Sequence, residues 1–292
     1  MTRARAALRR SREPRVTDIG RLAGPVLAFG GPYSNLRATE ALRGEARRLG
    51  IEADHCLCTG DLIAYCAEPA ETVDLIRDWG CPVVLGNCEE NLALGAEDCG
   101  CGFAEGSTCD LLAKTWFAYA SARLDAERRA WVGARPRLLR CELAGRRIAV
   151  VHGAVDRISR FIFASTPEAE KRRQVGLADA EVVLAGHCGI PFTQGLGGGR
   201  VWHNAGVIGI PANDGTPAVW YSLLIPAGDA IRFEHRRLWY DQAGAAAAMR
   251  AAALPEAYAR ALETGLWPSL DVLPEAERAA TGRPLAPGSI GC

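Results

Sequence analysis

The 292-residue sequence has little of what several protein classes require. It contains two lysines and 7% aromatic residues, and its 34 acidic and 34 basic side chains give zero net charge. A neutral chain lacks the basic surface that phosphate-dominated nucleic-acid binding needs. No window approaches the roughly 18 consecutive apolar residues of a membrane span, and the Arg-rich N-terminus lacks the apolar stretch of a secretory signal. We therefore expect a cytoplasmic protein that binds neither nucleic acid nor membranes.

Cysteine, in contrast, is abundant, with eleven residues. An odd number without a secretory signal favours free thiols or metal ligands over a disulfide framework. The hydrophobic share of 49% and the charged share of 23% are typical of a soluble globular protein. The length fits one large domain with terminal extensions.

Short apolar runs with strand character alternate with helical patterns along the chain. Helical periods begin after Ser34, a candidate N-cap, and near Ala70. Later runs, after a glycine-rich hairpin connection, have the character of antiparallel strands. The first group lies at 25–29, 53–58, 81–85, 147–151 and 181–185, and the antiparallel group at 200–204, 218–225 and 230–238. This order predicts an α/β fold with mixed sheets.

Composition divides the chain into three parts. Residues 1–20 are Arg-rich without a sustained period, which predicts a flexible arm. Residues 21–240 carry the strands and form the expected core. Residues 241–292 begin with an alanine-rich helical pair and continue into a tail rich in proline and glycine, so we expect a C-terminal helical extension.

Polar side chains follow four of the apolar runs. Asp61, Asn87, His152 and His187 each come directly after a predicted strand. Taken singly, each has an ordinary structural explanation, such as a capping carboxylate or a buried histidine. Because the carboxyl ends of strands in open α/β sheets meet at one edge, we expect these four to converge. Together they predict a site for zinc, iron or manganese.

The same segments resemble the ordered motifs of the calcineurin-like metallophosphoesterases, from about Val26 to Gly265. The resemblance implies a four-layer α/β/β/α sandwich, similar to the compact bacterial phosphodiesterase branch, with a two-metal site at the strand ends. In that family a bridging hydroxide attacks phosphorus while both metals hold the phosphoryl oxygens. The matching motifs are Thr59-Gly60-Asp61, Gly86-Asn87-Cys88-Glu89, Val151-His152-Gly153, Gly186-His187-Cys188-Gly189 and Asn204-Ala205-Gly206.

The resemblance fails at one of the two metal positions. The family's first Asp-X-His motif is Gly31-Pro32-Tyr33 here, and the last histidine of its Gly-His-X-His motif is Gly189. The matches to the second metal are kept: Asn87, His152 and His187 match its ligands, and Asp61 matches the bridging carboxylate. This pattern implies one firmly bound manganese, iron or zinc ion per chain, with a second ion as an alternative.

Hydrolysis of a phosphoester or related ester is the leading functional hypothesis, with a small phosphorylated or anionic substrate. The histidine that assists the leaving group in the family is Cys88 here, so Cys88 and His152 are the candidate catalytic residues; equally, Cys88 fills the vacated volume as a small hydrophobe. Arg157 and Arg160 lie just beyond His152 and are candidates for holding phosphate oxygens, with a surface-helix role as the alternative.

Two other function classes stay open from the sequence. Asp61, His152 and His187 form a two-His-one-carboxylate set, which with open coordination positions suits a mononuclear Fe(II) enzyme that is not a hydrolase. Alternatively, the chain is a non-catalytic binding module in which the turn Gly30-Gly31-Pro32-Tyr33-Ser34, at a helix N-terminus, holds an anion.

The remaining cysteines and one histidine offer an additional site. The stretch 98–110 differs from the compact family members and predicts a lid insertion. Its three cysteines with Cys88 would supply four thiolates for a second metal, or else free thiols or a local redox pair. His203 either faces the metals or points away, according to strand alternation. These additional candidates are Tyr33, Cys99, Cys101, Cys109, Cys188 and His203. A homo-oligomer is compatible with the sequence.

Overall fold

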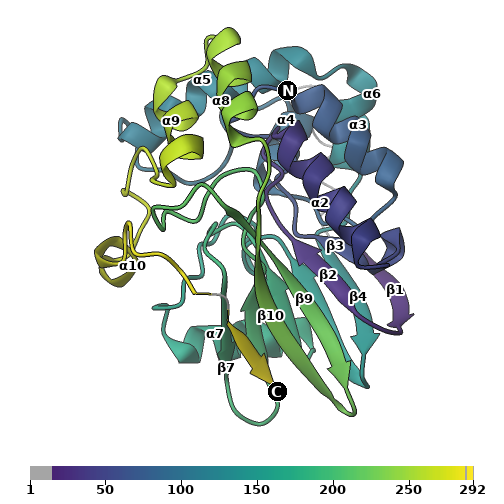
Figure 1. The fold of residues 1–292 in the computed structure, drawn as a ribbon. Coiled ribbons are helices and arrows are strands. Elements are labelled where there is room, and N and C mark those ends of the chain that lie inside the picture. Colours follow the sequence, from purple (N-terminus) through teal and green to yellow (C-terminus); the bar gives the residue numbers. More distant parts are fainter. Residues whose placement is uncertain (1–14, 287, 292) are drawn as a thin grey trace, which may run out of the picture.

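The computed structural model describes residues 15–286 and 288–291. Two mixed sheets pack face to face, and helices cover both outer faces (Figure 1). Side chains from both sheets form the cluster between them, including Val26, Ile148 and Phe233. The predicted four-layer α/β/β/α sandwich is confirmed.

The larger sheet has six strands, and two of them lead into the loops that carry His152 and His187. Strands β1, β4 and β5 form one half, with β4 parallel to β1 and antiparallel to β5. Strand β6 is parallel to both β5 and β8, and β7 pairs antiparallel with β8. In order across the sheet, the strands are β1 (Val16–Leu22), β4 (Leu138–Leu143), β5 (Arg146–Val151), β6 (Val182–Ala185), β8 (Val201–Asn204) and β7 (Phe192–Gly195).

The second sheet has five strands and is largely antiparallel. Among the described strands of this sheet, β2 and β3 form the one parallel pair, and β3 leads into the loop that carries Asp61. Along β2, Val26 and Ala28 face the other sheet whereas Leu27 and Phe29 face the helices, so a continuous apolar run is buried on both sides. In order, the strands are β11 (Ser289–Gly291), β10 (Ala230–Leu238), β9 (Val219–Ala227), β2 (Val26–Phe29) and β3 (Cys56–Cys58).

The helices lie on the two outer faces. The large cluster over the five-stranded sheet contains residues of α2 (Leu36–Arg48), α3 (Pro69–Trp79), α4 (Asn87–Leu94), α5 (Thr108–Arg123), α6 (Ala126–Gly133), α8 (Gln242–Ala251) and α9 (Glu256–Thr264). On the other side, α7 (Glu168–Ala178) covers the six-stranded sheet. The 3-10 turn η1 (Ala53–His55) precedes β3, and α10 (Glu275–Ala279) belongs to the C-terminal segment. No described helix is long and apolar enough to cross a membrane.

Three local expectations differ from the structure. Val16–Gly20 of the predicted arm 1–20 belong to β1, an exposed edge strand anchored by the buried Leu22, while residues 1–14 lie outside the described part. The predicted strand 81–85 makes only a bridge from Val83 to Cys58, since Pro82 lacks an amide proton. The N-cap of α2 is Asn35, whose side chain accepts from the Ala38 amide.

His203 lies between the sheets, away from the other candidate ligands. Its ring stacks on His235, with centroids 4.7 Å apart, and packs against Phe233. The Thr193 hydroxyl lies 2.8 Å from His203 Nδ1 and 2.9 Å from His235 Nε2, and Ser222 Oγ lies 3.0 Å from His235 Nδ1. The strand alternation therefore directs His203 into the inter-sheet core.

This histidine pair predicts acid sensitivity of the fold. Burial lowers the pKa of His235 to about 4, whereas an unfolded histidine titrates near pH 6.5. Between these values the unfolded chain takes up a proton that the folded chain does not, so the free energy of unfolding falls as the pH drops, by about 3 kcal/mol from His235 at full effect. Urea unfolding of metal-free protein from pH 7 to 4 should therefore show a shallower loss for His235→Gln than for wild type. Equal slopes for His235→Gln and wild type would contradict the assignment.

Candidate metal centre

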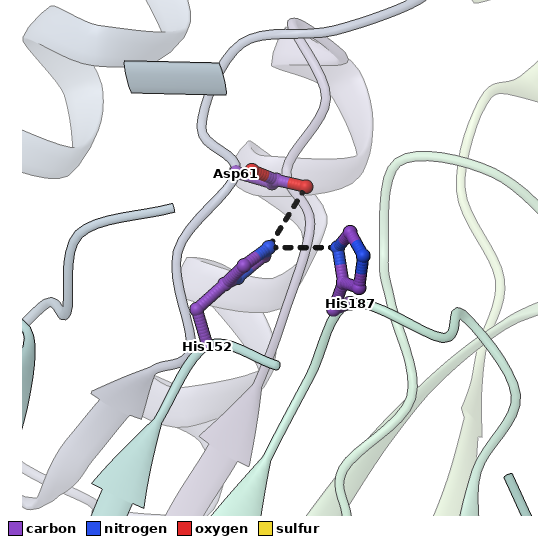
Figure 2. Close-up of side chains that lie close together, drawn as sticks. All are labelled: Asp61, His152 and His187. Atoms are coloured by element: carbon purple, nitrogen blue, oxygen red, sulfur yellow. Dashed lines mark hydrogen bonds and ion pairs between the residues drawn. The ribbon is translucent and has the colours of Figure 1, made fainter. Parts of the chain in front are cut away.

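Four loops that are distant in the sequence bring their polar side chains together at one edge of the two sheets. Asp61 follows β3, His152 follows β5, His187 follows β6, and Asn87 is the first residue of α4. All four side chains are buried. Figure 2 shows Asp61 and His187 approaching the same ring nitrogen of His152, with their ligand atoms turned toward it.

The ligand atoms converge on one nitrogen of His152. Its Nε2 lies 2.9 Å from Asn87 Oδ1, 3.0 Å from His187 Nδ1 and 3.3 Å from an Asp61 carboxylate oxygen. The other ring nitrogen, Nδ1, lies 2.7 Å from the Thr59 carbonyl oxygen and must donate to it, because a carbonyl only accepts. In a neutral His152 the Nε2 lone pair therefore points at other electron-rich atoms.

A divalent transition-metal ion resolves this crowding of lone pairs. Imidazole nitrogen and carboxylate oxygen bind zinc at about 2.0–2.2 Å, which places neighbouring ligand atoms about 2.8–3.6 Å apart for octahedral to tetrahedral coordination. The separations of 2.9, 3.0 and 3.3 Å from His152 Nε2 fall within this range. Asp61, His152 and His187 have ligand atoms within 4.8 Å of one another. The residues present fit such an ion.

Electrostatics prepares the three ionisable groups for this task. Burial lowers the pKa of His187 to about 3, with the neighbouring His152 adding to the effect, so His187 keeps a free lone pair. Burial disfavours the charge of Asp61, but His152 outweighs it through its charge and hydrogen bond, and the pKa of Asp61 is lowered. Burial also disfavours the charge of His152, but the charge and hydrogen bond of Asp61 outweigh it, and the pKa of His152 is raised. The site thus offers a carboxylate, a neutral His187 and a His152 whose ring proton a bound Zn, Mn or Fe ion would have to displace.

The amide of Asn87 is oriented by the neighbouring cysteine segment. Its Nδ2 donates to the Cys99 carbonyl oxygen at 2.8 Å and lies 3.2 Å from Cys101 Sγ. Since the NH₂ group has its acceptors on this side, Oδ1 must be the atom turned toward His152. The stretch 98–110 therefore lies over the site and fixes one of its candidate ligands.

Glu89 is a positioning residue to which the sequence analysis gave no role. Its carboxylate accepts from the backbone amides of Asp61, Ile63 and Gly86 at 3.0–3.1 Å. Burial, followed by the charge of Asp61, raises the pKa of Glu89 to about 7. The available signal was its place three residues after Gly86 at the start of α4, which is the spacing of a capping box. Glu89 ties the Asp61 loop to α4.

Comparison with known proteins agrees with this architecture. No protein-family model matches the sequence. A segment of 55 residues is 44% identical to the uncharacterized protein MJ0912 of Methanocaldococcus jannaschii, covering 19% of this chain and 22% of that protein. A metallophosphoesterase structure from Sphaerobacter thermophilus matches 84% of this chain and 100% of its own, with a TM-score of 0.66 and 22% identity. The hypothetical protein PH1004 from Pyrococcus horikoshii OT3 matches 83% of this chain and 99% of its own, with a TM-score of 0.70 and 17% identity.

The chain has the calcineurin-like metallophosphoesterase fold. Within this fold, the structure brings Asp61, Asn87, His152 and His187 together, as the motifs predict. The structure also shows which side chains lie beside Gly31 and Gly189, where the resemblance lacks metal ligands.

Two aromatic rings fill the space beside the missing ligands of this metallophosphoesterase fold. A Cβ atom on Gly31 would lie within 3.0 Å of three ring carbons of Tyr33. A Cβ atom on Gly189 would lie 2.9 and 3.1 Å from two ring carbons of Trp267. Burial, with Asp61 adding to it, raises the pKa of Tyr33 well above 10, so Tyr33 is a neutral phenol. Carboxylate and imidazole side chains at Gly31 and Gly189 would collide with these rings.

The arginines proposed to hold phosphate lie elsewhere in the metallophosphoesterase fold. Arg160 forms ion pairs with Asp156 at 3.3 Å and Glu170 at 3.0 Å, and Arg157 is exposed. Among the described residues, no lysine or arginine lines the cavity that opens beside Asp61 and His187. The described lining of this cavity therefore offers no cationic side chain to a negatively charged group.

The turn before α2 has its amides occupied by the fold itself. The Gly31 amide donates to the Gly60 carbonyl, the Tyr33 amide to the Asp61 carbonyl and the Ser34 amide to the Leu62 carbonyl. The side chain of Ser34 is fully buried and accepts from the Ala64 amide at 3.3 Å. These groups are not available to hold an anion, so Gly31 and Ser34 position the Asp61 loop.

The cysteines divide into a disulfide and buried thiols. Cys99 and Cys101 form a disulfide, which withdraws two sulfurs from any four-thiolate centre. Burial raises the pKa of Cys88 well above its usual value and that of Cys188 to about 12, so both are neutral thiols. Cys109 and Cys188 line the cavity. A second metal built from Cys88, Cys109 or Cys188 would need to displace their protons.

Proposed function

We propose that this protein is a metal-dependent hydrolase of a phosphoester or a related ester, and that it works with one firmly bound divalent ion. The main support for this proposal is that Asn87 Oδ1, His187 Nδ1 and an Asp61 oxygen all lie close to His152 Nε2. The filled space beside Gly31 and Gly189 supports a single ion over a pair.

The chain's own residues would divide the work as follows. When bound, the ion supplies a water of lowered pKa and withdraws electron density from the substrate's oxygen. Asp61, Asn87, His152 and His187 hold the ion, and Thr59 fixes the His152 tautomer through its carbonyl. Cys88 Sγ lies 3.6 Å from Asn87 Nδ2 and, as a neutral thiol of raised pKa, is a weak proton donor, so we assign it a packing role beside Asn87.

Elemental analysis of the purified protein tests this proposal first. We expect about one transition-metal ion per chain, loss of hydrolysis of p-nitrophenyl phosphate esters after chelation, and recovery after adding back manganese, iron or zinc. Iron with oxygen-dependent turnover and no hydrolysis would favour the Fe(II) alternative. Absence of metal would favour the binding module, and two ions per chain would contradict the single-ion proposal.

A further inference from the structure

A cavity of about 60 Å³ opens directly beside the proposed metal ligands. Asp61 and His187 form part of its wall. Six of its fourteen other lining residues are aromatic, and they come from separate parts of the chain: the loops after β2, β3 and β5, the 98–110 stretch, α9 and the C-terminal segment. These six side chains are Tyr33, Tyr65, Phe103, Phe161, Tyr258 and Trp267, and we call the space they enclose the aromatic cavity.

The rings that form the aromatic cavity are held in place by one another. Tyr65 lies edge-on to Tyr33, with centroids 4.8 Å apart, and packs against Tyr258 at 4.7 Å. Phe161 stacks on the imidazole of His187, with centroids 4.1 Å apart and planes 26° from parallel. The Trp267 indole donates Nε1 to the Pro211 carbonyl oxygen at 2.7 Å, which fixes the orientation of its ring. A ligand in this space meets pre-positioned ring faces and edges within reach of the ion.

The charge of this space favours a singly charged ligand. Asp61 is the one carboxylate, and no cationic side chain is present, among the described residues that line it. Glu89 directs its carboxylate to three backbone amides instead. A divalent ion with Asp61 leaves one net positive charge, which a singly charged ester neutralises. A doubly charged ester would leave a negative charge in an apolar environment, which is costly.

We infer that the aromatic cavity binds, next to the metal ion, an aromatic ring on the ester group that a singly charged substrate retains when its leaving group departs. This inference rests on the proposed function, since it names the substrate class of the same site. Ring faces and edges attract an aromatic group beyond the burial of apolar area, through offset-stacked and edge-to-face contacts. An alkyl group of the substrate gains only the burial.

A matched pair of diesters tests the inference. Phenyl p-nitrophenyl phosphate and methyl p-nitrophenyl phosphate share the leaving group and the single charge. After correction for their rates without protein, we expect kcat/KM to be at least about tenfold higher for the phenyl ester. The ratio should fall toward one in Phe161→Leu and Trp267→Leu. Trp239→Leu, which changes a 62%-exposed tryptophan outside the cavity, should keep the wild-type ratio.

Binding gives a second readout that needs neither turnover nor a variant. Calorimetry on the metal-loaded protein should show monomethyl phenylphosphonate binding at least about tenfold more tightly than monomethyl methylphosphonate. Hydrolysis without preference for the phenyl group would overturn the inference and leave the proposed function standing. Phenyl-selective binding without hydrolysis of either diester would overturn the proposed function and support the ring site. Absence of selectivity in both assays overturns the inference.

Discussion

Replacing His187 with alanine is expected to lower the bound metal from about one ion per chain to a small fraction, and to reduce ester hydrolysis by at least about a hundredfold. Loss of an outer partner of a metal ligand already costs about 10–100-fold in affinity or activity, and His187 Nδ1 is itself one of the converging ligand atoms. Elemental analysis after gel filtration and kcat/KM for a p-nitrophenyl diester measure the two effects.

Backbone conformation decides which companion variants are informative. His187 has a φ of +63° and Asp61 a φ of +56°, in the left-handed region that asparagine tolerates better than alanine. His187→Asn and Asp61→Asn therefore remove the ligand or its charge with less strain, and both should lose metal while keeping the wild-type melting behaviour of the metal-free protein. His55→Ala, a histidine outside the site, should retain full metal content. Unchanged metal in all three site variants would refute the assigned centre.

The sequence predicted the parts of the site that follow from strand order. Asp61, His152 and His187 each come directly after an apolar run, and the carboxyl ends of strands meet at one edge whatever the details of packing. The structure brings these residues together with Asn87. Their binding of a metal ion stays a prediction, since it depends on solution measurement.

Features that depend on packing between distant segments could not be predicted. Trp267 reaches Gly189 from the C-terminal segment, and nothing in its local sequence indicates that contact. Arg160 follows His152 closely along the chain, but its charge is taken by Asp156 and Glu170. In both cases separation along the sequence is a poor guide to separation in space, because the path of the loop decides where the side chain points.

The ring of Tyr33 is expected to make Gly31 unusually intolerant of any side chain. Gly31 has a φ of +43°, so a Cβ atom there costs about 1 kcal/mol in backbone strain. The same Cβ would lie within 3.0 Å of three ring carbons of Tyr33, and overpacking of this kind costs about 1–3 kcal/mol more. Gly31→Ala should therefore lower the free energy of unfolding by about 2–4 kcal/mol in urea titrations.

A double-mutant cycle separates the ring from the backbone. In a Tyr33→Ala background, Gly31→Ala should cost only the backbone part, about 1 kcal/mol, so the two substitutions should couple by about 1–3 kcal/mol. Gly44→Ala on α2, where nothing lies within 4 Å of the new Cβ, should instead stabilise slightly, because alanine favours a helix. Absence of coupling between Gly31 and Tyr33 would mean that the ring can move aside. A carboxylate at this position would then be sterically allowed, and the single-ion proposal would keep only the contact of Trp267 with Gly189 as steric support.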